Sequence, residues 1–333
     1  MSRLNTTSLL SLLTASVLAS GAMAQAVTLN LSNEYAANSI HGVGDASFAE
    51  AVAEETGGEV EIIVHYGGAL GYKSADHFDA VGEGALEIAN TFGGALGGLE
   101  ALFLVSSLPF LVTTVEDARL LYQASEERFR EIFEDGDQIL LYASPWPPSG
   151  LWGRKPMNNH DSLQGVKIRT YDRNGTIALN ILGANAITMS WADVVPAIST
   201  GAIDAVLSSA EGGVSSSFGD YFNFYTEIYN YAIPLNFVHM NRAIFNDLTE
   251  SQQEGIMRAA ARVNEVIWAA VPDRLEVTYQ QLADQNITVV ASDDENFRAA
   301  LQEAGETTLL EWLAATGEDG QSIIDAFESM RSE

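Results

Sequence analysis

The sequence predicts an α/β fold built from two sheets, each mixed but mostly parallel and flanked by helices. Short β-rich runs alternate with amphipathic helical segments, which is typical of βαβ units. A segment rich in proline and tryptophan, 144–153, interrupts this alternation, so a second sheet is expected after it. A helical pattern at 249–285 is long enough to run along both sheets.

The first sheet is predicted from the elements that precede residue 144. Gly57 and Gly58 end the first helix, and loops rich in glycine and polar residues close the strands. The last helix carries apolar residues at helical spacing and ends before Gly136. The predicted strands are 27–32, 60–66, 85–92 and 138–143, and the predicted helices are 44–55, 74–84 and 116–135.

The second sheet is predicted from the residues that follow the crossover at 144–153. An apolar run at 234–241 is then expected to cross back to the first sheet. In the long helix, Thr249 and Gln252 have the spacing of a capping box, and Pro272 is expected to kink it. The strands predicted for this sheet are 166–170, 186–189 and 202–207, with helices at 174–182 and 192–200.

The N-terminus has the features of a secretory signal peptide. Arg3 precedes an apolar run at 9–18, and Ala22 and Ala24 form a small-residue cleavage site before Gln25. Because a membrane span needs about twenty apolar residues, we expect residues 1–24 to be removed and not to anchor the protein. The alternative is a buried N-terminal helix. We therefore expect a periplasmic protein whose mature chain does not insert into the membrane.

Charge and composition narrow the possible partners. The formal net charge is −29, which disfavours nucleic acid and anionic membrane surfaces. Hydrophobic residues still make up 47% of the chain, so the acidity is expected on the surface of a folded protein and does not indicate disorder. The chain has no cysteine, which excludes a lipid anchor and disulfides.

Common catalytic and cofactor motifs are absent from the sequence. The five histidines are scattered, and none belongs to a pattern with metal-ligand spacing. The glycines at 42–45 lack the third glycine of a dinucleotide fingerprint, and those at 93–98 lack the lysine of a P-loop. No nucleophile elbow of the form Gly-x-Ser-x-Gly occurs. We therefore expect a binding protein without catalysis, cofactor or metal.

Several spaced motifs together identify a family. Residues 161–169 read DSLQGVKIR, and LGA, MSWADV and GAID follow at 182–184, 189–194 and 201–204. The first half adds TGGEV at 56–60 and LPFL at 108–111. With these motifs in this order, nearly the whole mature chain resembles the solute-receptor family of tripartite ATP-independent periplasmic (TRAP) transporters.

This resemblance implies a two-lobed periplasmic solute-binding fold, in which hinge strands and a long lobe-spanning helix connect lobes that close on a ligand. It assigns residues 25–145 and 235–273 to the first lobe, and 146–234 and 274–333 to the second. The implied function is binding of a small organic acid and its delivery to the membrane permease subunits of a TRAP transporter. The receptor is expected to be a monomer.

In this family the arginine that ends the K-I-R strand clamps a ligand carboxylate, and here that residue is Arg169. A planar guanidinium can hold both carboxylate oxygens. Two residues depart from the family pattern: Trp152 stands where many members have a second arginine, and Glu211 lies in an altered segment. Because both suit a cationic ligand, a small amine or amino alcohol is an alternative ligand. A secreted hydrolase and a sensory module without transport are alternatives of other classes.

Ligand contacts are expected from loops at the carboxyl ends of the strands. For each aromatic side chain among them, packing in a lobe core is the alternative role. The candidate ligand-binding residues are Arg169, Glu34, Tyr35, His41, Tyr66, Phe92, Trp146, Trp152, Trp191, Ser209, Glu211 and Asn236.

Overall fold

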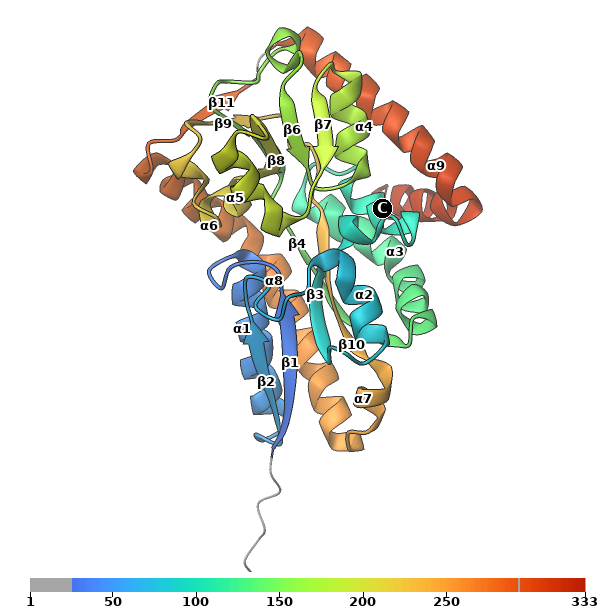
Figure 1. Ribbon diagram of the computed structural model, residues 1–333. Helices are drawn as coiled ribbons and strands as arrows, with labels where there is room; N and C mark the ends of the chain where they lie inside the picture. The colour runs from blue at the N-terminus through green and yellow to red at the C-terminus, as the bar shows by residue number, and fades with distance from the viewer. Residues whose placement is uncertain (1–25, 293, 333) are drawn as a thin grey trace, which may run out of the picture.

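The chain forms two lobes, each a twisted sheet with helices packed against it (Figure 1). This computed structural model describes residues 26–292 and 294–332. The predicted signal peptide, 1–24, lies outside the described residues. The expected α/β class with two mixed sheets is confirmed.

The first lobe contains a five-stranded sheet in the order β2-β1-β3-β10-β4. Strands β2 and β3 run parallel to β1, whereas β10 runs antiparallel to both of its neighbours. The strands are β1 (Val27–Asn33), β2 (Val60–His65), β3 (Ile88–Phe92), β4 (Gln138–Pro145) and β10 (Leu235–Asn241). The helical segments are α1 (Ile40–Glu55), α2 (Ser74–Gly82), η1 (Gly93–Leu96), η2 (Ala101–Ser107), α3 (Val115–Asp135) and α7 (Arg242–Asn246).

Helix α1 begins at Ile40, four residues before the predicted start at Gly44. The side chain of Ser39 caps the helix by accepting a hydrogen bond from the Gly42 amide at 3.0 Å. Glycines inside this first turn suggested a loop, but close packing requires them. A Cβ on Gly42 would lie 2.4 Å from the Ala36 carbonyl oxygen, and one on Gly44 would lie 2.7 Å from the Ile267 side chain.

The second lobe contains a six-stranded sheet in the order β11-β9-β5-β8-β6-β7. Here β5 is the strand that runs antiparallel to its neighbours, β8 and β9. The strands are β5 (Ser149–Gly153), β6 (Lys167–Thr170), β7 (Asn185–Thr188), β8 (Ala205–Ser209), β9 (Phe224–Glu227) and β11 (Thr288–Ala291). The helical segments are η3 (His160–Leu163), α4 (Arg173–Ile181), α5 (Trp191–Thr200), α6 (Ala210–Ser215) and η4 (Phe218–Asp220).

Two strand connections join the lobes. The predicted crossover at 144–153 holds the end of β4 and all of β5, so the chain passes from one sheet to the other within a few residues. It returns from β9 to β10, as the apolar run at 234–241 predicted. The antiparallel strand of each sheet is therefore the strand that receives the chain from the other lobe.

Helix α8 (Glu250–Asp284) contacts both lobes, which confirms the predicted long helix. Thr249 and Gln252 form the expected capping box, and the helix continues without interruption through Pro272. Its first half packs on α1 and β4, and its second half packs on α6 (Figure 1).

Helix α9 (Glu295–Arg331) was not predicted, and it also contacts both lobes. Phe297 and Leu301 belong to the core around α4, whereas Trp312 and Phe327 pack into the core of the first lobe. The turn between the two halves falls at Gly317, whose φ of 60° is left-handed. The final part of the chain thus packs on the first lobe, in contrast to the assignment of 274–333 to the second.

The lobes are in contact in this structure. One apolar cluster combines Tyr35 and Phe92 of the first lobe with Trp146 of the crossover and with Tyr171 and Leu207 of the second lobe. Among the described residues, no helix is both long and apolar enough to cross a lipid bilayer.

Candidate ligand-binding site

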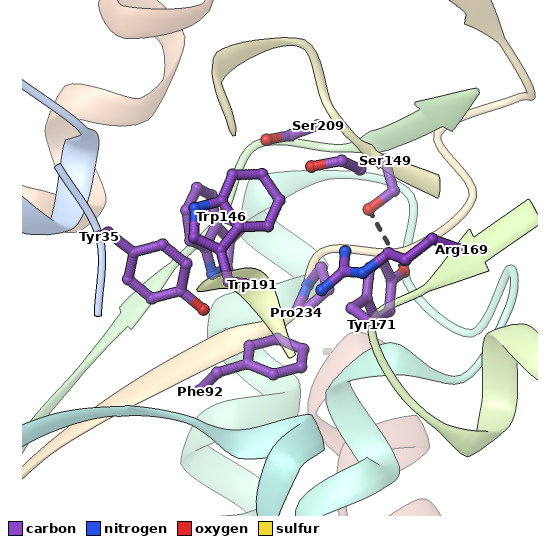
Figure 2. A pocket seen from close by; sticks show the side chains of 10 residues that line it. Tyr35, Phe92, Trp146, Ser149, Arg169, Tyr171, Trp191, Ser209 and Pro234 are labelled. Atoms are coloured by element: carbon purple, nitrogen blue, oxygen red, sulfur yellow. Dashed lines mark hydrogen bonds between the residues drawn. The ribbon is translucent and has the colours of Figure 1, made fainter. Parts of the chain in front are cut away.

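A cavity lies where the two lobes meet, at the carboxyl ends of several strands (Figure 2). Its inner part has a volume of about 30 Å³. An outer chamber of about 400 Å³ adjoins it and shares Arg169 and several aromatic residues with it. The inner cavity is lined by Tyr35, Phe92, Trp146, Ser149, Arg169, Tyr171, Trp191, Ser208, Ser209 and Pro234.

Arg169 is the charged group of the inner cavity. It lies on β6, and its side chain is only 3% exposed. Its Nε donates to the Met189 carbonyl oxygen at 3.0 Å, and its guanidinium carbon lies 5.3 Å from the centroid of the Trp191 ring. No carboxylate within the described chain forms an ion pair with it. Burial lowers the pKa of Arg169 to about 10. The site therefore holds a desolvated cation without an anionic partner.

Aromatic rings surround this cation and exclude water from it. The Tyr35 ring lies 4.9 Å from Trp146 and 5.8 Å from Trp191 between centroids, and Phe92 lies 5.6 Å from Tyr171. Tyr35 and Phe92 come from the first lobe, whereas Tyr171 and Trp191 come from the second, so the enclosure depends on closure. Charge interactions are stronger in such a dry space than in water.

Hydroxyl and carboxylate oxygens complete the lining. The Tyr171 hydroxyl donates to Ser149 Oγ at 3.3 Å. In the outer chamber, Asp172 caps α4 through Oδ1, which accepts from the Gly175 amide at 3.0 Å. Its Oδ2 is buried and has no hydrogen-bond partner, and burial raises the pKa of Asp172 to about 6. A ligand N–H or O–H group would satisfy this oxygen.

Glu34 bridges the lobes at the edge of the outer chamber. One carboxylate oxygen accepts from the Ser74 amide at 3.0 Å, at the start of α2 in the first lobe. The other accepts from the Ala192 amide at 3.1 Å, in the first turn of α5 in the second lobe. A carboxylate is favoured at a helix N-terminus by the helix dipole, so Glu34 stabilises the closed arrangement at both ends.

Glu211 makes the reciprocal bridge from the second lobe. Its Oε1 accepts from the Ile40 amide at 2.9 Å, at the start of α1 in the first lobe. The same oxygen pairs with Arg274 at 2.6 Å. Burial raises the pKa of Glu211, and Arg274 opposes that rise. Because it already has a cationic partner, Glu211 is not available to an amine ligand.

The structure brings seven of the twelve candidate residues to this site. Six of them line the inner cavity, and Glu34 lines the outer chamber; the six are Tyr35, Phe92, Trp146, Arg169, Trp191 and Ser209. The other five, which are His41, Tyr66, Trp152, Glu211 and Asn236, line neither chamber.

Each of these five has another position. Trp152 is fully buried in the core of the second lobe, where its Nε1 donates to the Ser209 carbonyl oxygen at 3.0 Å. His41 and Asn236 are buried behind Trp146: the His41 ring is 4.2 Å from Trp146, and Asn236 Oδ1 accepts from the indole N–H at 2.9 Å. Tyr66 is half-buried and follows β2. None of them reaches the ligand space directly.

Four lining residues were missed by the sequence analysis. Tyr171 follows β6 directly, so the strand-end rule could have found it, and Ser208 neighbours the nominated Ser209. Ser149 and Pro234 lie at the two lobe crossovers, and no sequence motif identifies them.

The described residues contain no group of three or more metal-binding side chains placed to hold a metal ion. The inner cavity instead offers one cation, hydroxyl groups and aromatic surface. An amine bound there would meet Arg169 and find no carboxylate among the lining side chains. The alternative of an amine or amino alcohol is therefore not supported.

The comparisons with known proteins agree with this geometry. A solute-binding protein of Chromohalobacter salexigens is 27% identical over 266 residues, which cover 77% of each chain. The crystal structure of DctP7, an extracytoplasmic solute receptor of Bordetella pertussis that binds pyroglutamic acid, superposes with a TM-score of 0.87 at 27% identity. That match covers 91% of this chain and 100% of DctP7.

A second solved relative is a TRAP solute-binding protein from a marine metagenome, described as specific for pyroglutamate. Its TM-score is 0.87 at 28% identity, and the match covers 92% of this chain and 100% of that protein. The sequence profile of bacterial extracellular solute-binding protein family 7, DctP, matches residues 31–312. This chain therefore belongs to family 7 of the bacterial extracellular solute-binding proteins.

Proposed function

We propose that this protein is the periplasmic receptor of a TRAP transporter and that it binds a small organic acid between its lobes. The observation that carries this proposal is Arg169, a buried guanidinium that faces the interlobe cavity and has no ion-pair partner among the described residues. A carboxylate would restore the electrostatic stabilisation that the guanidinium loses on burial, and its two oxygens fit the planar fork of donors.

The second part of the ligand should be compact and should carry a hydrogen-bond donor. The inner cavity is small, and Asp172 Oδ2 is an unused acceptor in the adjoining chamber. Pyroglutamate has this combination, because its ring carries both a carboxylate and a lactam N–H. The two relatives that bind it are also similar to this chain over their whole length. We therefore propose pyroglutamate, or a cyclic acid of that size, as the ligand.

One serine–histidine pair, Ser144 and His41, has to be considered as a possible catalytic pair, and its position supports binding without catalysis. His41 Nδ1 lies 2.7 Å from Ser144 Oγ, the contact expected of a nucleophile and its base. Both residues are buried, and neither lines the cavity. Burial also lowers the pKa of His41 to about 3, so the imidazole is a very weak base. These features argue against the secreted hydrolase.

After closure, the receptor would carry its ligand as a monomer to the permease subunits in the membrane. Family membership supports an extracytoplasmic location, and the predicted signal peptide supports the periplasm. The long connecting elements β4, β10 and α8 would act as the hinge.

The test is calorimetry on the mature protein with pyroglutamate and with 2-pyrrolidone, which is the same ring without the carboxylate. Pyroglutamate should bind and should raise the unfolding free energy by about 2.7 kcal/mol at 100 times its dissociation constant. The lactam alone should bind at least two decades more weakly. Equal binding of both compounds, or binding of amines and no acids, would refute the proposal.

A further inference from the structure

A continuous chain of side-chain hydrogen bonds lies behind the aromatic wall of the cavity. From Trp146, the indole N–H donates to Asn236 Oδ1 at 2.9 Å, and Asn236 Nδ2 donates to Asn90 Oδ1 at 2.7 Å. Asn90 Nδ2 then donates to Asp45 Oδ1 at 2.7 Å. Every member of this chain is buried.

A second branch connects Asp45 to Tyr35. Asp45 Oδ2 accepts from Asn33 Nδ2 at 2.5 Å, and Asn33 Oδ1 accepts from the Tyr35 backbone amide at 2.7 Å. Asn33 and Asn90 are paired in register on β1 and β3, and Asp45 lies on α1. One carboxylate is therefore linked to two neighbouring residues that line the cavity, Tyr35 and Trp146 (Figure 2).

The chemistry of the three ends fixes the direction of every bond. An indole N–H and a backbone N–H can only donate, and the Asp45 carboxylate, once ionised above about pH 7, can only accept. With donors at Trp146 and Tyr35 and an acceptor at Asp45, each asparagine has one amide orientation that satisfies both of its neighbours. The order is set by these ends and does not depend on how an amide is assigned.

We propose that Asp45 is a positioning residue for the ligand site: as the acceptor at the centre of both branches, it holds Trp146 and Tyr35 in the orientation that encloses the ligand. This inference rests on the proposed binding function. Asp45 itself lies outside both chambers and does not touch the ligand space.

The cost of keeping this carboxylate supports a specific role. Asp45 is completely buried and has no ion-pair partner among the described residues. Burial raises the pKa of Asp45 to about 7, while its hydrogen bonds with Asn90, Asn33 and Tyr142 oppose that rise. A buried carboxylate without a cation is unfavourable for stability. If the position required only packing, a neutral side chain of the same shape would be less destabilising to bury.

The substitution Asp45→Asn keeps the shape and reverses one bond. The new amide places an N–H group against a donor, either that of Asn33 or that of Asn90. If Asn33 turns over, its amide N–H faces the Tyr35 backbone N–H. If Asn90 turns over, Asn236 must follow, and an N–H then faces the Trp146 indole. One of the two cavity residues loses its anchor in either case.

The exchange Asn33→Asp with Asp45→Asn restores the pattern without changing composition or charge. In this double variant, the new carboxylate at position 33 accepts from the Tyr35 amide and from the new amide at position 45. The carbonyl oxygen at position 45 then accepts from Asn90. A double-mutant cycle therefore separates the direction of the bonds from the presence of a carboxylate at position 45.

Calorimetry with pyroglutamate at about pH 8, where Asp45 is ionised, should show at least tenfold weaker binding for Asp45→Asn and recovery to within about threefold of the natural protein in the double variant. The control is Tyr142→Phe, which removes the hydroxyl 3.4 Å from Asp45 Oδ1 without reversing any amide. It should bind within about twofold of the natural protein. Circular dichroism and thermal melts check that each variant is folded.

The nuclear magnetic resonance signal of the Trp146 indole N–H gives a readout that needs no ligand. It should shift or broaden in Asp45→Asn and return in the double variant. If no acid binds the natural protein, the proposed function fails, and this signal still tests the chain. Unchanged affinity and an unchanged indole signal in Asp45→Asn would overturn the inference. A double variant that does not fold, or that binds no better than Asp45→Asn, would also overturn it.

Discussion

Replacing Arg169 by alanine should abolish most of the affinity for an organic acid. Burial lowers the pKa of Arg169 to about 10, which corresponds to about 3 kcal/mol of lost stabilisation of the charged guanidinium. A ligand carboxylate at this position would restore the lost stabilisation of the guanidinium. The guanidinium would in turn stabilise the carboxylate, which is also buried. Removing one partner of such a pair costs about 3–5 kcal/mol, equivalent to two to three or more decades in the dissociation constant.

Calorimetry on Arg169→Ala and Arg169→Lys measures this loss. The lysine variant should recover only part of it, because an ammonium keeps the charge but loses the two parallel hydrogen bonds and the stacking on Trp191. The matched control is Lys167→Ala, which removes an exposed cation two residues away on the same strand. Lys167→Ala should leave the affinity within about twofold. Near-natural binding by Arg169→Ala would show that Arg169 does not bind the carboxylate, and the organic-acid proposal would fall with it.

Two further predictions concern closure and pH. Glu34→Gln removes a negative charge from two helix N-termini in opposite lobes. Because the interaction of a charge with each helix dipole stabilises the closed form by up to about 1 kcal/mol, this change should weaken ligand binding roughly five- to thirtyfold. Small-angle scattering should show a larger ligand-free radius of gyration for Glu34→Gln than for the exposed control Glu50→Gln, and equal radii would contradict the bridging role. For Asp45, a pKa raised to about 7 means that its contribution to stability is fully present below about pH 4 and is lost as the pH rises through 7, by about 1.36 kcal/mol per pH unit. Tyr142 and Tyr66, whose pKa values are raised by burial and then by the charge of Asp45, stay neutral across this range. Urea denaturation from pH 4 to 8 should show this slope in the natural protein and not in Asp45→Asn, and parallel curves would contradict the assignment.

Much of the site could be predicted because the carboxyl ends of parallel strands meet at one edge of a sheet. Tyr35 follows β1 closely, Phe92 ends β3 and Arg169 lies near the end of β6, so the rule for strand ends located all three. Strand geometry also explains why the structure places Trp152 away from the cavity. Side chains alternate along a strand, and on β5 Trp152 points to the helix-covered core. Its place in the family pattern did not indicate which face it occupies.

The contacts between the lobes could not be read from the sequence. Glu211 and Ile40 are separated by 171 positions, and Glu34 and Ala192 by 158. No local pattern marks either pair, because each bond forms only when two separate sheets meet. The same holds for the second half of α9, whose attachment to the first lobe depends on a turn at Gly317 and on a core contributed by α3 and η2.

The interlobe bridges and the buried cation have opposite effects on closure without ligand. Glu34 and Glu211 each satisfy the start of a helix in the other lobe, which stabilises the closed form. Closure also removes water from Arg169 without bringing it a carboxylate, and its carbonyl partners, Met189 and Leu207, lie in its own lobe. A ligand shifts a conformational equilibrium only by its differential affinity for the two states. A carboxylate should bind the closed form more tightly than the open form, because only in the closed form does it compensate for the desolvation of Arg169. The acid thus acts as the missing counter-charge of closure, and a neutral analogue of the same shape should fill the cavity without closing the lobes.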